Sequence, residues 1–270
     1  MAAIDRVRVL VVGDSGVGKT SLVHLICANA PIGNPSYTIG CSVEVKLHEY
    51  KAGTPEEKSY FIELWDIGGS AGHKNSRSIF YHPIHGIILV HDLANRKSQI
   101  NLRKWLSELL SKDHKIPQDG NDYDPEQFVG NQIPILIIGT KLDLAQIVRD
   151  NGRTRASSIA DECCSDEVFV DCNQVRHLSA GSSNAVKLSR FFDKVIERKF
   201  YSREGSMVSV DKGQHRVQHS KIDVDPTHTK TLITNDIEDL CKFERVLLVV
   251  DVVYELVMVK RACNSRVKNI

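Results

Sequence analysis

The chain has 270 residues, of which 41% are apolar and 26% are charged, and its formal net charge is +1. This length and apolar share are enough for a buried core, while a nearly neutral chain without a long basic run argues against nucleic acid as a partner. The seven cysteines, an odd number that includes the adjacent Cys163 and Cys164, are typical of a reducing compartment. No secretory signal precedes the first apolar run, so we expect a cytoplasmic protein.

A glycine-rich loop between a strand and a helix is the first strong signal. Residues 7–12 form an apolar run that predicts a buried strand, the loop GDSGVGKT follows, and a helix is predicted over residues 19–29. Glycines let backbone N–H groups approach phosphate oxygens closely, and the helix N-terminus adds a positive dipole. We expect Lys19 to contact the β- and γ-phosphates of a nucleotide and Thr20 to offer its hydroxyl to Mg²⁺. The predicted phosphate-binding residues are Gly16, Val17, Gly18, Lys19, Thr20 and Ser21.

Two strands are predicted next, at residues 42–50 and 59–65. Apolar and charged residues alternate in the first of them, which is typical of an antiparallel pair with one solvated face. Thr38 precedes this pair and can supply a second hydroxyl to the metal ion, and Asp66 follows it and can hold the ion through a water molecule. The N–H group of Gly69 is then placed to sense a γ-phosphate. The predicted metal ligands are Thr20, Thr38 and Asp66.

A base-binding signal follows a predicted strand at residues 86–92 and a predicted helix at 98–111. The apolar strand predicted at 133–139 is followed by a Thr-Lys-Leu-Asp sequence, and ligands of open α/β sheets lie at such carboxyl ends. A carboxylate at Asp143 can accept hydrogen bonds from the ring N–H and the exocyclic amine of guanine, whereas adenine offers no such pair. Without the phosphate loop, Asp143 would be interpreted as a helix cap. The base-binding residues predicted from this motif are Thr140, Lys141, Leu142 and Asp143.

The last base-binding loop has two candidates in the sequence. Residues 171–173 come immediately after residues 168–170 of a strand predicted at 168–172, and residues 179–181 precede the final helix. This loop must leave the edge of the sheet below the base. We therefore choose between the two candidates by their position relative to the strand. On this basis we prefer Asp171 and Cys172.

The final helix is predicted at residues 184–199, after another helix at 154–163. Its apolar spacing predicts the face that packs on the sheet. The residues expected on this face are Val186, Phe191, Phe192, Val195 and Ile196.

The phosphate loop, the LWDIGGSAG segment and the TKLD sequence together resemble the small GTPases of the Ras superfamily, and Rab-like members in particular, over residues 5–200. The resemblance implies an α/β P-loop NTPase fold in three layers. Its six-stranded sheet is mostly parallel, with one antiparallel edge strand and helices on both faces. The resemblance also implies GTP and GDP as ligands, Mg²⁺ as a cofactor, and effector and regulatory proteins as partners.

This chain departs from the family pattern at three places. Ser70 stands where the family has a glutamine that orients the attacking water, and a serine side chain is too short for that role. We therefore expect hydrolysis slower than the roughly 10⁻³ per second of ordinary small GTPases. Thr140 replaces the usual asparagine, and Pro31 and Ile32 occupy the place of an aromatic residue that packs against the base, which favours faster nucleotide release. The catalytic residues expected on this basis are Lys19, Thr38, Gly69 and Ser70.

Two functions remain open from the sequence. The intact phosphate and Mg²⁺ residues favour a nucleotide-dependent regulatory switch in intracellular signalling or trafficking. Ser70 favours a GTP-binding scaffold with little or no turnover, in the form of a homodimer.

The expected organisation is one GTPase domain followed by a tail. Residues 1–200 are expected to form the domain, which contains an inserted loop at 112–131, and residues 201–240 are expected to form a disordered linker. Residues 241–270 form an apolar tail that suits either an amphipathic helix or a strand, and its apolar part is too short and too charged to span a bilayer. Cys263 is the eighth residue from the end, too far for a prenylation box, so no intrinsic lipid anchor is expected.

Overall fold

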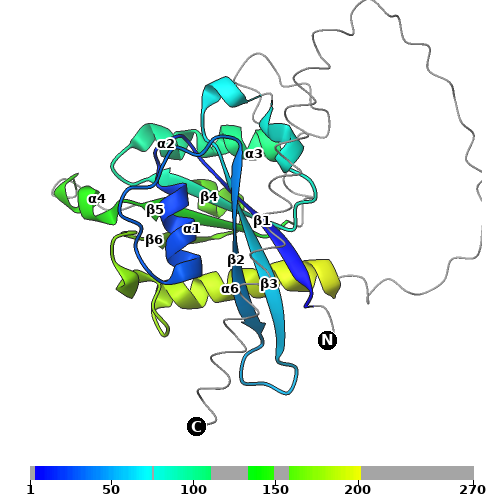
Figure 1. Ribbon diagram of the computed structural model, residues 1–270. Helices are drawn as coiled ribbons and strands as arrows, with labels where there is room; N and C mark the ends of the chain where they lie inside the picture. Colours follow the sequence, from blue (N-terminus) through cyan, green and yellow to red (C-terminus); the bar gives the residue numbers. More distant parts are fainter. Residues whose placement is uncertain (1–3, 75, 111–132, 149–157, 202–270) are drawn as a thin grey trace, which may run out of the picture.

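A computed structural model of the chain describes residues 4–74, 76–110, 133–148 and 158–201. Its centre is a six-stranded sheet in the order β2-β3-β1-β4-β5-β6 (Figure 1). β2 pairs with β3 in the antiparallel sense at one edge, and the other neighbouring strands are parallel. The predicted mixed sheet is therefore confirmed. The strands are β1 (Arg6–Val12), β2 (Cys41–Tyr50), β3 (Lys58–Ile67), β4 (Gly86–Asp92), β5 (Ile135–Thr140) and β6 (Asp166–Phe169).

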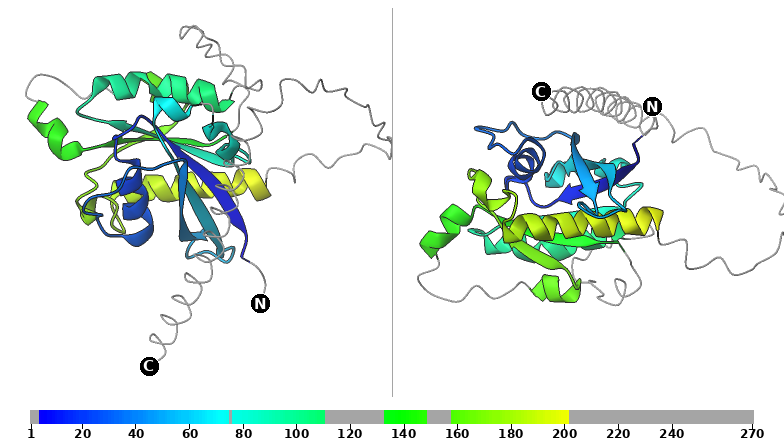
Figure 2. Two further views of the ribbon diagram at one scale, coloured as in Figure 1. Left: turned by 45° about the horizontal axis from the view of Figure 1, so that its top comes forward. Right: turned by 90° about the horizontal axis from the view of Figure 1, so that it is seen from below.

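Helices cover both faces of this sheet, as predicted (Figure 2). Successive residues of a strand point to opposite faces, so Val9 and Val11 of β1 pack in the core beneath α1 and α6, while Leu10 and Val12 pack in the core beneath α3. The α-helices are α1 (Lys19–Ala28), α2 (Arg96–Ile100), α3 (Leu102–Leu110), α4 (Leu142–Val148), α5 (Ser158–Glu162) and α6 (Ser183–Phe200). The 3₁₀ turns are η1 (Ala71–His73), η2 (Arg77–Phe80) and η5 (Val175–His177).

Most strands and helices differ from their predicted bounds by one or two residues, and two larger differences concern the helix after β4 and strand β6. The helix predicted at 98–111 is two helices that meet at Asn101, and the first is capped by the side chain of Asn95, which accepts from the N–H of Lys97. The strand predicted at 168–172 is β6 and ends at Phe169. The N–H of Val170 still donates to the carbonyl of Gly139 in β5. The chain then turns, with the N–H of Asp171 donating to the His177 ring and the N–H of Gln174 donating to the carbonyl of Asp171.

Val186 does not face the sheet, contrary to the prediction. Its side chain is 42% exposed, whereas the other four predicted residues are buried together with Leu188. The side chain of Ser182 caps α6 by accepting from the N–H of Ala185. The buried residues then recur at helical spacing from Leu188 onward, and Val186, two positions earlier, falls on another side of the helix.

The first residue of β4 limits how closely α6 can approach the sheet. A Cβ atom added at Gly86 would lie 2.5 Å from Cγ2 of Val195 and 3.2 Å from Cζ of Phe191. We expect Gly86→Ala to lower the free energy of unfolding by about 1 to 3 kcal/mol through overpacking. Chemical denaturation measures this effect. Gly33→Ala is the control, since nothing lies within 4 Å of the added methyl group. Equal stability of the two variants would contradict the close packing of α6 on Gly86.

Several predictions fall on residues that lie outside the described ones. These are the loop at 112–131, the start of the helix at 154–163, the linker at 201–240 except for its first residue, and the tail at 241–270. Among the described residues, no helix has the length and apolar character needed to cross a bilayer.

Candidate functional site

The loop between β1 and α1 is shaped for close approach of an anion. A Cβ atom at Gly13 would lie 2.1 Å from the carbonyl oxygen of Val90, so only glycine fits there. Gly18, the residue before α1, has a φ of 91° in the left-handed region, and no side chain caps the start of this helix. The first N–H groups of the helix are therefore left without a capping side chain, and such groups suit phosphate oxygens.

Lys19 lies over this loop and is almost completely buried. Its Nζ donates to the carbonyl oxygens of Gly13 and Asp14, both at 2.9 Å. Burial lowers the pKa of Lys19, and the nearby carboxylates of Asp66 and Asp14 act in the opposite direction. The loop thus holds a cation at the place where the sequence predicts contact with phosphates.

Three oxygen-bearing side chains from different parts of the chain meet beside Lys19. Thr20 and Thr38 donate to the same oxygen of Asp66, Oδ2, at 2.5 and 3.2 Å, and their two hydroxyl oxygens are 3.1 Å apart. Asp66 is 1% exposed, and its Oδ1 has no hydrogen-bond partner among the described residues. Burial raises the pKa of Asp66, against the effect of the Thr20 hydrogen bond and of Lys19. A buried carboxylate oxygen without a partner, next to two hydroxyls, fits Mg²⁺, which prefers hard oxygen ligands.

The segment after β3 closes the other side of the site. A Cβ atom at Gly69 would lie 2.5 Å from the backbone nitrogen of Ser15, and one at Gly68 would lie 2.8 Å from the carbonyl oxygen of Thr38. The N–H of Gly68 also donates to the carbonyl of Gly40 at 2.8 Å. This segment therefore contacts both the phosphate loop and the segment around Thr38.

A pocket of about 360 Å³ lies between these elements, within the size range of small-molecule sites. It is lined by the phosphate loop, the segment before β2, the backbone after β3 and one residue after β5. Its lining residues are Ser15, Gly16, Gly18, Lys19, Thr20, Ser21, Pro35, Ser36, Tyr37, Thr38, Gly69 and Lys141.

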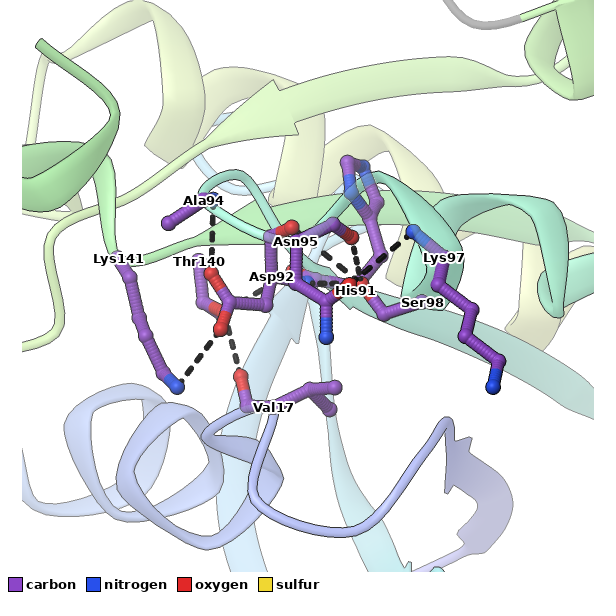
Figure 3. Close-up of polar contacts among 9 residues, drawn as sticks. All are labelled: Val17, His91, Asp92, Ala94, Asn95, Lys97, Ser98, Thr140 and Lys141. Atoms are coloured by element: carbon purple, nitrogen blue, oxygen red, sulfur yellow. Dashed lines mark hydrogen bonds and ion pairs between the residues drawn. The ribbon is translucent and has the colours of Figure 1, made fainter. Parts of the chain in front are cut away.

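Thr140 connects the end of β5 to the phosphate loop. Its hydroxyl lies 2.5 Å from the carbonyl oxygen of Val17 and 3.0 Å from that of His91, so one donor serves two backbone acceptors (Figure 3). The next residue, Lys141, has a φ of 56°, and its Nζ is 2.8 Å from Oδ2 of Asp92. The sequence reasoning missed Asp92 as the partner of Lys141, although a carboxylate at the carboxyl end of β4 was a usable signal.

Replacing Thr140 by valine is expected to lower the free energy of unfolding by about 1 to 3 kcal/mol. Valine keeps the shape of the side chain but leaves buried carbonyls without their donor. Thermal or chemical unfolding of the protein without nucleotide measures the effect. Thr140→Ser keeps the hydroxyl and is the matched control. If the valine variant were as stable as the serine variant, the two hydrogen bonds of the Thr140 hydroxyl would not contribute to the stability of the fold.

The remaining predicted base-binding residues lie next to Thr140 and Lys141. Asp143 is exposed in the first turn of α4. Asp171 is 4% exposed, and its Oδ1 accepts from the N–H of Asn173 at 2.9 Å. Burial raises the pKa of the Cys172 thiol to about 12, and the charges of Asp171 and Asp143 act in the same direction.

The rival loop at 179–181 has a different local role. It follows η5, and the hydroxyl of Ser179 donates to the carbonyl of Arg176 at 3.0 Å. It leads directly to Ser182, the cap of α6. The assignment of Asp171 and Cys172 to the base site stays a prediction.

Comparisons with known proteins agree with this arrangement. A family model described as "Ras family" matches residues 8–201. Rab-like protein 3 of Homo sapiens is 55% identical over 217 residues, which are 77% of this chain and 92% of that protein, and Rab-like protein 3 of Xenopus tropicalis is 56% identical over 216 residues with the same coverage. The small GTPase LIP1 of Arabidopsis thaliana is 42% identical over 153 residues, which are 52% of this chain and 42% of that protein. The chain belongs to the Ras family of small GTPases.

Proposed function

We propose that the chain is a switch that binds GTP or GDP with Mg²⁺ and hydrolyses GTP slowly. The observation that carries the proposal is the meeting of Thr20, Thr38 and Asp66, because it joins the phosphate loop and the segment before β2 at one set of oxygens. Mg²⁺, when bound, neutralises phosphate charge. Its ligands would be Thr20 and Thr38, with Asp66 holding a coordinated water.

The switching behaviour follows from which groups reach the γ-phosphate. In the proposal Lys19 contacts the β- and γ-phosphates, and Thr38 and the N–H of Gly69 hold their segments in place only when a γ-phosphate is present. Both segments then present a surface to effector and regulatory proteins in the GTP state and relax in the GDP state. A cytoplasmic location is part of the proposal and is supported by five free cysteines among the described residues.

Single-turnover hydrolysis tests the catalytic part of this proposal. We expect phosphate release slower than about 10⁻³ per second, because Ser70 cannot orient the attacking water as a glutamine does. Ser70→Gln is expected to accelerate release. A wild-type rate equal to that of ordinary small GTPases would contradict the role given to Ser70. Identification of the nucleotide that copurifies with the protein tests guanine binding independently.

A GTP-binding scaffold without turnover is the second candidate, and Ser70 is the observation that favours it. In this form the bound nucleotide stabilises the fold. A second copy of the chain, in a homodimer, supplies the interactions that Ser70 cannot make. No phosphate release with or without cell extract, together with a dimeric mass in GTP by light scattering, would support the scaffold. Measurable turnover by a monomer would exclude it.

A further inference from the structure

A buried arginine at the start of η2 holds the segment that follows Gly69. Arg77 is 5% exposed, and its Nε and Nη2 donate to the two carboxylate oxygens of Glu108 on α3 at 2.6 and 2.7 Å. Its guanidinium also lies 4.0 Å from the centre of the Trp105 ring. Such a planar fork paired with a carboxylate and stacked on an aromatic ring has a fixed orientation, which lysine does not reproduce.

The remaining terminal nitrogen of this guanidinium bonds to the residue that follows Gly69. Nη1 of Arg77 donates to the carbonyl oxygen of Ser70 at 3.2 Å. Ser70 directly follows Gly69, whose backbone packs against Ser15 of the phosphate loop. The position of the Gly69 N–H therefore depends on a carbonyl that Arg77 holds.

The phosphate loop is held by the same helix and by the residue that precedes it. The indole Nε1 of Trp105 donates to Oδ1 of Asp14 at 2.9 Å, and Nδ2 of Asn101 donates to Oδ2 at 2.8 Å. Asp14 follows Gly13 in the phosphate loop. Trp105 of α3 and Asn101, the residue before this helix, thus fix the phosphate loop, and Glu108 of α3 fixes the Ser70 segment through Arg77.

We propose that Arg77 is a positioning residue for recognition of the γ-phosphate. By anchoring the Ser70 carbonyl to α3, it sets the place of the Gly69 N–H relative to the phosphate loop and so determines the preference for GTP over GDP. This inference rests on the proposed function. GDP has no γ-phosphate, so loss of Arg77 changes the affinity for GTP more than the affinity for GDP. The bonds to Asp14 act on the loop that holds the phosphates of both nucleotides, so their loss changes both affinities.

Dissociation constants for GDP and for guanosine 5′-(β,γ-imido)triphosphate test the proposal. Arg77→Lys is expected to weaken binding of the triphosphate analogue about tenfold and to leave GDP affinity within about twofold, because lysine cannot contact Glu108 and Ser70 in the same geometry. Trp105→Phe keeps a ring beneath Arg77 but removes the bond to Asp14, and is expected to weaken both nucleotides to a similar degree.

Tyr81→Phe is the matched control. Its hydroxyl donates to Oε1 of Glu108 at 2.5 Å without a bond to Ser70, so its loss disturbs the same carboxylate and is expected to leave the ratio of the two constants unchanged. If Arg77→Lys does not fold, the paired variant Arg77→Met with Glu108→Leu removes both charges together, and the same tenfold loss is expected.

Equal weakening of both nucleotides by the Arg77 variants, or no change in either, would overturn the proposal and leave Arg77 a purely structural residue. Failure of the wild-type chain to bind either guanine nucleotide would instead overturn the proposed function itself. The two failures are distinguishable because the second appears before any substitution is made.

Discussion

Asp143→Asn is expected to weaken GDP and GTP binding by a factor of about 10³ to 10⁴. Asp143 is two residues after Lys141, which lines the pocket, and in the proposed site its carboxylate accepts from the ring N–H and the exocyclic amine of guanine. Asparagine offers one acceptor and one NH₂ donor. That donor faces the guanine amine, also a donor, so one hydrogen bond is lost and two polar groups are left opposed.

The substituted site should gain affinity for a different base. Xanthine carries a carbonyl oxygen where guanine has its amine, so the asparagine NH₂ can donate to it. Competition between GDP and xanthosine diphosphate measures the change, and we expect the order of affinities to reverse in the variant. Leu144→Asn, at the exposed neighbouring residue, is the control and should leave guanine preference intact. An unchanged preference in Asp143→Asn would remove this residue from the base site.

The sheet and the oxygen cluster were predictable because their signals are local. Each motif residue stands next to an apolar strand, and parallel strands bring their carboxyl ends to one edge of the sheet. Lys19 and Asp66 therefore had to lie near each other once β1 and β3 were recognised as neighbours. Thr38 required only that its segment lead into the strand paired with β3.

Contacts between helices and loops could not be predicted in this way. Arg77 and Glu108 are 31 positions apart, and no periodic pattern distinguishes this pair from exposed charges of the same kinds. The hydroxyl of Thr140 is a similar case, because its acceptors belong to Val17 and His91. Such bonds depend on the packed positions of whole elements.

The position of Val186 and the end of β6 were predicted wrongly for different reasons. Val186 is apolar and was therefore assigned to the buried face of α6, although the helical repeat places it away from the side that carries Leu188 and Phe191. At the end of β6 the N–H of Val170 still donates to β5, and the chain then turns, with the N–H of Gln174 donating to the carbonyl of Asp171. The hydropathy of residues 168–172 does not reveal that turn.

Thr20→Asn is expected to weaken GTP binding about 10- to 100-fold in the presence of Mg²⁺ and to affect GDP much less. The Thr20 hydroxyl is one of the two hydroxyls that donate to Asp66. Asparagine removes that hydroxyl at the first turn of α1. A triphosphate carries more charge near Asp66 than a diphosphate does, so the loss of a metal ligand weakens GTP more strongly than GDP.

A titration of each nucleotide with Mg²⁺ and then with EDTA separates metal binding from general damage. Thr20→Ser keeps the hydroxyl and should follow the wild type throughout. In EDTA the wild type and Thr20→Asn should bind GDP alike, because no metal remains to be held. If Thr20→Asn weakened GDP equally with and without Mg²⁺, the threonine would be a steric element of the loop, and the metal site would have to be built from Thr38 and Asp66 alone.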